Sequence, residues 1–205
     1  MGGKSLSIPP KEKSCHQAAP NGLDCPAMLK KAAIVLPLMI AAICGFIALR
    51  PSDFRVTRST LIAAPASQVF ARVNDFHQWE EWSPWADADP HARLEYAGAP
   101  SGVGAVFRWA GNARVGEGSM TITESRPPEA IRIALDFVKP APGRSDVDFI
   151  FQPEADGTRV TWSMSGKNNF MAKAFALLVD CDKIVGGDFE KGLATLKRVS
   201  EAPKP

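Results

Sequence analysis

The sequence has few of the residues that build metal centres and disulfide frameworks. Its 205 residues include only four cysteines and three histidines. These are Cys15, Cys25, Cys44, Cys181, His16, His77 and His91. The cysteines form no Cys-x-x-Cys pair and the histidines are widely scattered, so neither a zinc site nor a disulfide scaffold is supported.

A strong charge of one sign is also missing. Residues 51–205 hold eighteen Lys and Arg against twenty Asp and Glu, a balance of −2, whereas residues 1–50 hold six against two. Nucleic-acid binding needs clustered cations, so we expect no nucleic-acid partner. The glycines between Gly102 and Gly118 lack the Gly-Lys-Ser/Thr ending of a phosphate loop, and we expect no cofactor.

One long uncharged run is present. Residues 32–49 read AAIVLPLMIAAICGFIAL and lie between Lys30-Lys31 and Arg50. A membrane span takes roughly 20 apolar residues, with a range of about 17–25, so this run predicts one transmembrane helix. The alternative is a cleaved signal peptide, but no clear A-x-A site follows the run.

The segment before this run is polar. Residues 1–31 include four prolines and show no apolar period, which predicts disorder. Residues 28–31 resemble a bacterial N-terminus, so we expect that translation could begin at Met28. The cations on both sides of the run favour only weakly a bacterial inner-membrane protein with its C-terminal domain in the periplasm.

The rest of the chain alternates between apolar and polar residues in several segments, as expected for an antiparallel sheet with one buried face. The expected strands cover residues 53–62, 103–109, 118–124, 130–137, about 146–151 and 160–165, with a weaker edge strand at 91–97. The pattern predicts that Ile133, Leu135, Phe149, Val160 and Trp162 are buried. On the same pattern Arg132, Asp136, Asp148 and Thr161 are exposed.

Two helical regions frame these strands. Pro65 suits the first turn of a short helix that ends at Asn74-Asp75. After a cap at Asn168 or Asn169, apolar residues recur at three- and four-residue spacing to Leu196, which predicts one helix of nearly 30 residues. Asp182 falls on its apolar stripe, and Gly186-Gly187 should loosen it.

This order of elements, and several short motifs, resemble the START-like helix-grip superfamily (SRPBCC), in its bacterial polyketide cyclase/dehydrase and lipid transport branch. The motifs are APASQVF (64–70), WEEWSPW (79–85), SGVG (101–104), GEG (116–118) and GTRVTW (157–162). The resemblance covers residues 53–200 and leaves 201–205 as a tail. It implies an α+β fold, in which a curved sheet of about seven strands wraps around the C-terminal helix.

The resemblance also implies a cavity between the sheet and that helix, lined mainly by apolar side chains. The expected ligand-binding residues are Phe107, Trp109, Met120, Ile133, Phe149, Trp162, Met164, Phe175, Leu178, Asp182 and Val185. Asp182 is the sharpest of these, because a buried carboxylate is unfavourable without a partner. It either binds a polar ligand group or has a structural role, in an ion pair with an arginine or a bond to the tryptophan cluster, and we favour the structural role.

The tryptophan-rich stretch offers a second set of candidates. Trp79, Trp82 and Trp85 are spaced by three, which suits either an aromatic lid or plain packing, and packing is favoured. His77 beside Glu80-Glu81 could act in acid–base chemistry, but adjacent carboxylates point in different directions, so surface solvation is favoured.

Three functions remain open. The first is a membrane-tethered domain that binds a hydrophobic or lipid-like small molecule, and the second is a polyketide cyclase or dehydratase. The third is a partner-recognition domain whose groove is filled by its own side chains. A large apolar pocket favours the first, convergence of His77 or Asp182 on one point favours the second, and the lack of a pocket favours the third.

Overall fold

A computed structural model describes residues 25–86, 88–177 and 180–202, and it divides into two units, residues 1–46 and 47–205. The helix α1 covers Cys25–Leu49, so it begins before residue 32, the expected start of a helix, and the prediction of disorder was wrong for residues 25–31. The described part leaves out all of residues 1–24 and the side chains of residues 25–32 and 34. Most of the segment expected to be disordered therefore lies outside it. Over the described residues, none of the helices is both long enough and apolar enough to cross a membrane.

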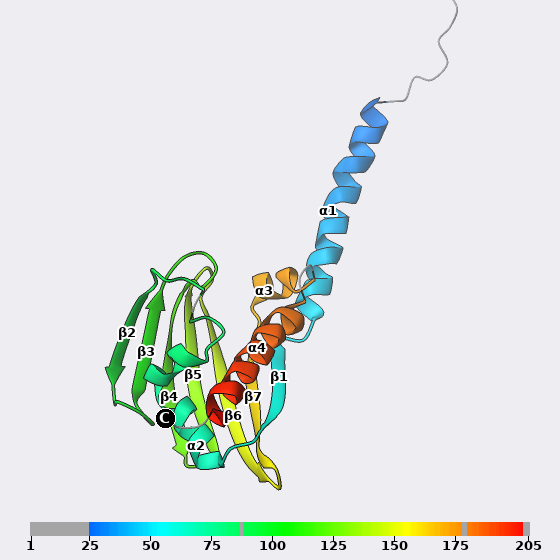
Figure 1. Cartoon of the computed structure of the whole chain (residues 1–205). Coiled ribbons are helices and arrows are strands. Elements are labelled where there is room, and N and C mark those ends of the chain that lie inside the picture. The colour runs from blue at the N-terminus through cyan, green and yellow to red at the C-terminus, as the bar shows by residue number, and fades with distance from the viewer. Residues whose placement is uncertain (1–24, 87, 178–179, 203–205) are drawn as a thin grey trace, which may run out of the picture. The chain divides into compact units, whose positions relative to one another are not determined.

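The second unit contains one seven-stranded antiparallel sheet, which confirms the expected number of strands (Figure 1). The strands are β1 (Asp53–Ile62), β2 (Arg93–Gly98), β3 (Ala105–Ala110), β4 (Glu117–Arg126), β5 (Ala130–Lys139), β6 (Gly143–Glu154) and β7 (Gly157–Lys167). Their order across the sheet is β1-β7-β6-β5-β4-β3-β2. Consecutive strands from β2 to β7 are therefore neighbours, and β1 adds to the free edge of β7.

The alternation correctly predicted which face of the sheet is buried. Ile133, Phe149 and Val160 are completely buried, and Leu135 and Trp162 nearly so. On the opposite face Arg132 is exposed, whereas Asp136, Asp148 and Thr161 are half-buried rather than exposed. Arg132 donates to the Asp148 carboxylate at 2.8 Å, a contact that covers part of each side chain.

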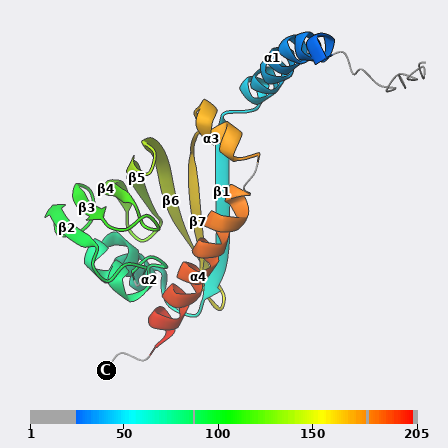
Figure 2. The ribbon, with the colours of Figure 1, turned by 90° about the horizontal axis from the view of Figure 1, so that it is seen from above.

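The helices of this unit follow two of its strands, β1 and β7. After β1 come α2 (Ala66–Asn74) and the 3-10 helix η1 (Phe76–Glu81), and after β7 come α3 (Phe170–Phe175) and α4 (Cys181–Glu201). Figure 2 shows α4 running along the β1 end of the sheet, against which it packs. The Trp162 ring stacks on Phe189 of α4, with ring centroids 4.0 Å apart.

The prediction of one continuous terminal helix was wrong. The Asn169 side chain caps α3, as expected, by accepting a hydrogen bond from the Ala172 amide at 2.8 Å. A second cap follows, because the Asp180 carboxylate accepts from the Lys183 amide at 3.2 Å. The apolar spacing continues through this junction, but Asp180 starts a new helix there.

Candidate functional site

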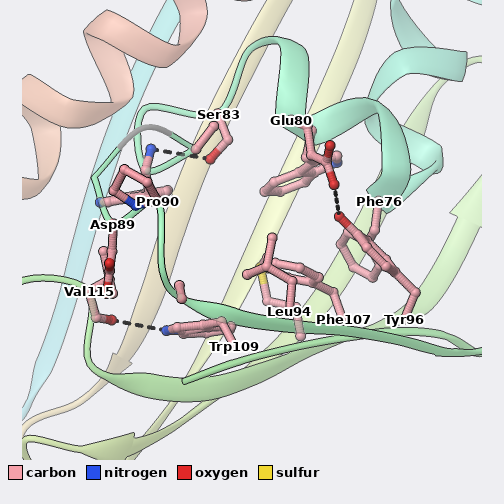
Figure 3. A pocket seen from close by; sticks show the side chains of 15 residues that line it. Phe76, Glu80, Ser83, Asp89, Pro90, Leu94, Tyr96, Phe107, Trp109 and Val115 are labelled. Carbon is pink, nitrogen blue, oxygen red and sulfur yellow. Dashed lines mark hydrogen bonds between the residues drawn. The ribbon is translucent and has the colours of Figure 1, made fainter. Parts of the chain in front are cut away.

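A cavity of about 350 Å³ opens between the segment that follows α2 and the β2 end of the sheet (Figure 3). Known small-molecule pockets range over about 300–1,000 Å³, so its size suits a small ligand. Its lining residues are Phe76, Trp79, Glu80, Ser83, Trp85, Ala86, Asp89, Pro90, Ala92, Leu94, Tyr96, Phe107, Trp109, Val115 and Met120. They come from η1, from the connection between η1 and β2, from strands β2, β3 and β4, and from the β3–β4 turn.

The floor of the cavity is built by strand alternation. Phe107 and Trp109 lie two residues apart on β3, and Met120 pairs with Phe107 across the β3–β4 ladder. The Phe107 and Trp109 rings stack with centroids 5.9 Å apart. The indole N–H of Trp109 donates to the Val115 carbonyl at 3.0 Å, which fixes the ring over the sheet.

The opposite wall comes from the tryptophan-rich stretch. The Asp75 carboxylate caps η1 by accepting from the His77 amide at 2.9 Å. The indole N–H of Trp79 donates to the Val73 carbonyl at 2.9 Å, and its ring also packs on the core residue Phe149. Trp85 is 38% exposed and reaches the cavity, whereas Trp82 is buried in the core. The three tryptophans therefore both pack the core and line the cavity.

A polar pair joins the two walls at one end of the cavity. The Tyr96 hydroxyl donates to the Glu80 carboxylate at 2.7 Å, and Figure 3 shows the two side chains meeting from η1 and from β2. Burial, and then the hydrogen bond to Glu80, raise the pKa of Tyr96 above its usual range. Tyr96 therefore remains a protonated hydrogen-bond donor at neutral pH.

Behind Tyr96, His77 stacks on the phenol ring with centroids 4.2 Å apart. The Nδ1 atom of His77 lies 3.0 Å from the Asp75 carboxylate. Burial acts to raise the pKa of Asp75, but the hydrogen bonds from His77 and Gln78 outweigh it and lower that pKa. His77 lines a separate, smaller cavity of about 130 Å³ on the other side of Tyr96.

The eleven predicted ligand-binding residues fall into different environments. Three of them, Phe107, Trp109 and Met120, line the cavity. Four are buried in the core: Ile133, Phe149, Trp162 and Met164. Val185 is half-buried against the core, and Phe175 and Asp182 are exposed. Leu178 lies outside the described residues. The cavity was expected between the sheet and the C-terminal helix, but the stacked Trp162 and Phe189 rings occupy that space.

Asp182 is not on a buried stripe, as was expected, but in the first turn of α4 with its side chain 57% exposed. Its carboxylate lies 3.0 Å from the Arg58 guanidinium, so of the two structural partners considered, the arginine is the one that the structure shows. Arg58 points from β1 toward α4 and also contacts Glu190 at 2.7 Å. A Cβ at Gly186 would lie 2.0 Å from this guanidinium, so a larger residue there would push the Arg58 side chain out of its present position.

This ion pair predicts a pH-dependent stability effect. The hydrogen bond from Arg58 lowers the pKa of Asp182 below its ordinary value of 3.8, so the folded state favours the charged carboxylate. That stabilisation is present above the unfolded-state pKa and is lost as the pH falls through the lower, folded-state pKa. We expect Asp182→Asn to lower the melting temperature by no more than about 4 °C at pH 7, because exposed pairs contribute little.

The measurement is thermal unfolding of the wild type and the variant from pH 7 down to pH 2. The difference should shrink as the pH falls below 3.8. Asp188→Asn is the matched control, since Asp188 pairs with Lys191 within α4 and does not connect the helix to the sheet. A difference that persists at pH 2 would contradict this account.

Sequence reasoning missed most of the polar residues of the cavity. Glu80 was assigned to the surface, and Ser83, Asp89 and Tyr96 were not considered as site residues. Residues 76–92 follow neither a helical nor a strand period, so the direction in which their side chains point could not be derived from the sequence. One signal was present: Tyr96 is the single tyrosine of the chain, and it lies on the expected edge strand.

A comparison with family profiles matches residues 53–201 to the family described as polyketide cyclase / dehydrase and lipid transport. The chain belongs to this family. That assignment confirms the fold expected for residues 53–200. A comparison with curated protein sequences gives no match.

Solved structures share the helix-grip fold of this polyketide cyclase/dehydrase family member. Protein CV1439 from Chromobacterium violaceum aligns with a TM-score of 0.54 at 16% identity, over 75% of this chain and all of that one. The di-domain ARO/CYC BexL of the BE-7585A biosynthetic pathway aligns at 0.55 and 16% identity, over 87% of this chain and 61% of BexL. The di-domain ARO/CYC StfQ of the steffimycin pathway aligns at 0.55 and 11% identity, over 73% and 51%. The chain thus spans less than two thirds of either di-domain protein, and these identities establish the fold alone.

Proposed function

We propose that this domain binds a hydrophobic small molecule in the cavity between η1 and strands β2–β4. The cavity itself is the observation that carries the proposal, because aromatic rings from two separate walls face one space large enough for a ligand. Family membership supports the same proposal, since its description includes lipid transport. A lipid-like molecule is therefore among the candidate ligands.

Binding is favoured over the two alternatives. A partner-recognition domain with a filled groove is disfavoured by the open cavity of about 350 Å³. A cyclase or dehydratase was expected to direct His77 or Asp182 at one point of the pocket. Instead, His77 lines the smaller neighbouring cavity, and Asp182 is paired with Arg58 on β1.

Native mass spectrometry of the full chain, purified from the cells that make it, tests this proposal. The wild type should carry a bound small molecule. Met120→Trp should lose it, because the larger side chain would fill the cavity floor. Ile150→Trp is the matched control, since Ile150 is 41% exposed and outside the cavity lining. A wild type without bound ligand, or a ligand retained by Met120→Trp, would refute the proposal.

We further propose that residues 32–49 hold the domain at a membrane as a single span, with the C-terminal domain on the periplasmic side of a bacterial inner membrane. The support is the sequence of this run, eighteen uncharged residues between Lys30-Lys31 and Arg50. The full chain should stay in the membrane fraction after a carbonate wash. Protease added to spheroplasts should digest the C-terminal domain. Release by carbonate would contradict the span, and protection from protease would contradict the orientation.

A further inference from the structure

The charged groups that line the cavity are all of one sign. Among its fifteen lining residues, Glu80 and Asp89 are acidic, and no lysine, arginine or histidine is present among them. Figure 3 shows Glu80 and Asp89 toward opposite ends of the row of lining side chains. A ligand in the cavity therefore meets a carboxylate at either end.

Neither carboxylate is neutralised by a basic side chain among the described residues. Glu80 accepts its hydrogen bond from the Tyr96 hydroxyl. Asp89 accepts from two backbone amides, those of His91 at 3.0 Å and Asn112 at 2.7 Å. These neutral donors hold the carboxylates in place but leave their negative charge uncompensated.

Nearby carboxylates outside the cavity are paired. Glu81, next to Glu80, lies 2.8 Å from Arg72, and Glu95, next to Tyr96, lies 2.7 Å from Arg108. Glu80 lines the cavity without a basic partner among the described residues, whereas Glu81 and Glu95, outside the cavity, are each paired with an arginine. The negative charge that lacks a basic partner therefore lies where the ligand would bind.

The aromatic side chains add a second attraction for positive charge. Phe76, Trp79, Trp85, Tyr96, Phe107 and Trp109 all line the cavity. The face of an aromatic ring attracts a cation within about 6 Å of its centroid, most strongly for tryptophan. Aromatic walls with carboxylates beside them fit an apolar body that carries an ammonium group, and they disfavour an anionic ligand.

We propose that the ligand of this cavity is an organic cation, an amine or quaternary ammonium group on a hydrophobic or aromatic body. This inference rests on the proposed function, that the cavity binds a small molecule, and it names the chemical class of that molecule. Glu80 and Asp89 supply the charge recognition, and the aromatic rings hold the apolar body.

Two isosteric probes separate charge from shape: (4-hydroxyphenyl)trimethylammonium, which is cationic, and 4-tert-butylphenol, which is neutral. Each is titrated calorimetrically into the full chain in detergent micelles, with a blank titration into micelles alone. The ammonium probe should bind about tenfold more tightly than the neutral one. Glu80→Gln and Asp89→Asn should each weaken the ammonium probe by about fivefold and leave the neutral probe within about twofold.

Glu95→Gln is the matched control, because it removes the same charge from β2 outside the cavity lining and should change neither affinity. Equal or tighter binding of the neutral probe to the wild type would overturn the cation proposal and leave the proposed function standing. An equal loss of ammonium binding in Glu95→Gln would also overturn it, because the charge recognition would not be local. If neither probe binds, the cation proposal fails, and the native mass spectrometry described above decides the proposed function separately.

Discussion

Phe149→Ala should lower the free energy of unfolding by about 3–5 kcal/mol, the usual loss for a fully buried phenylalanine. Phe149 is completely buried at the centre of β6. Its ring stacks on Trp162, with centroids 4.9 Å apart, and meets Trp79 edge-on. No rearrangement of these large neighbours would fill the space that the deleted ring leaves, so the cavity term adds to the lost burial.

Urea unfolding followed by tryptophan fluorescence measures this effect. Ile150→Ala is the control on the same strand, since Ile150 points to the other face and is 41% exposed. It should change stability by less than about 1 kcal/mol. A loss below about 1 kcal/mol for Phe149→Ala would show that the buried face of the sheet has been misassigned.

Gly118→Val should impair both stability and ligand binding. Gly118 pairs with Trp109 across the β3–β4 ladder, and the indole ring lies over it. A Cβ at this position would lie 2.6 Å from Trp109 Cζ2 and 2.6 Å from the Asp136 carbonyl oxygen. The backbone cannot yield easily, so the indole ring must move toward the cavity that it lines. Overpacking of this kind destabilises by typically 1–3 kcal/mol.

The two effects are measured by urea unfolding and by the amount of small molecule retained in native mass spectrometry. Ser119→Val is the matched control, because Ser119 is the next residue of β4 and lies on the opposite face of the sheet. It should retain the bound molecule. Unchanged stability and binding in Gly118→Val would mean that the position of the Trp109 ring does not depend on the space that glycine leaves beneath it.

The sheet could be predicted from the sequence because each strand repeats its burial pattern several times. Val147, Phe149 and Phe151 alternate with polar or exposed neighbours, and a shift by one residue would bury the wrong set. Even the short edge strand β2 was found close to its expected position. The buried face and the antiparallel arrangement followed from this period.

The cavity could not be placed in this way, for two physical reasons. The apolar spacing through Phe175, Val185 and Phe189 predicted one helix over a binding groove, but Asp180 interrupts it and the Phe189 ring fills the space against Trp162. The wall that does form the cavity is irregular, and side chains such as Glu80 and Asp89 are positioned by turns and caps rather than by a period. Phe107, Trp109 and Met120 were found because they alone combine a strand period with a place on the cavity floor.

The position of the cavity at the β2 edge has a consequence for how a ligand enters. Strand β2 is six residues long and hydrogen-bonded to β3 alone, yet it contributes Leu94 and Tyr96 to the lining. Local opening requires less free energy at such an edge than at an interior strand such as β7, which pairs on both sides. Amide hydrogens of β2 should therefore exchange with solvent sooner than those of β7, and a bound ligand should slow them selectively. Brief separation of β2 from β3 would open the cavity while the core beneath α4 stays folded, so the rate of ligand entry and release can change without a change in global stability.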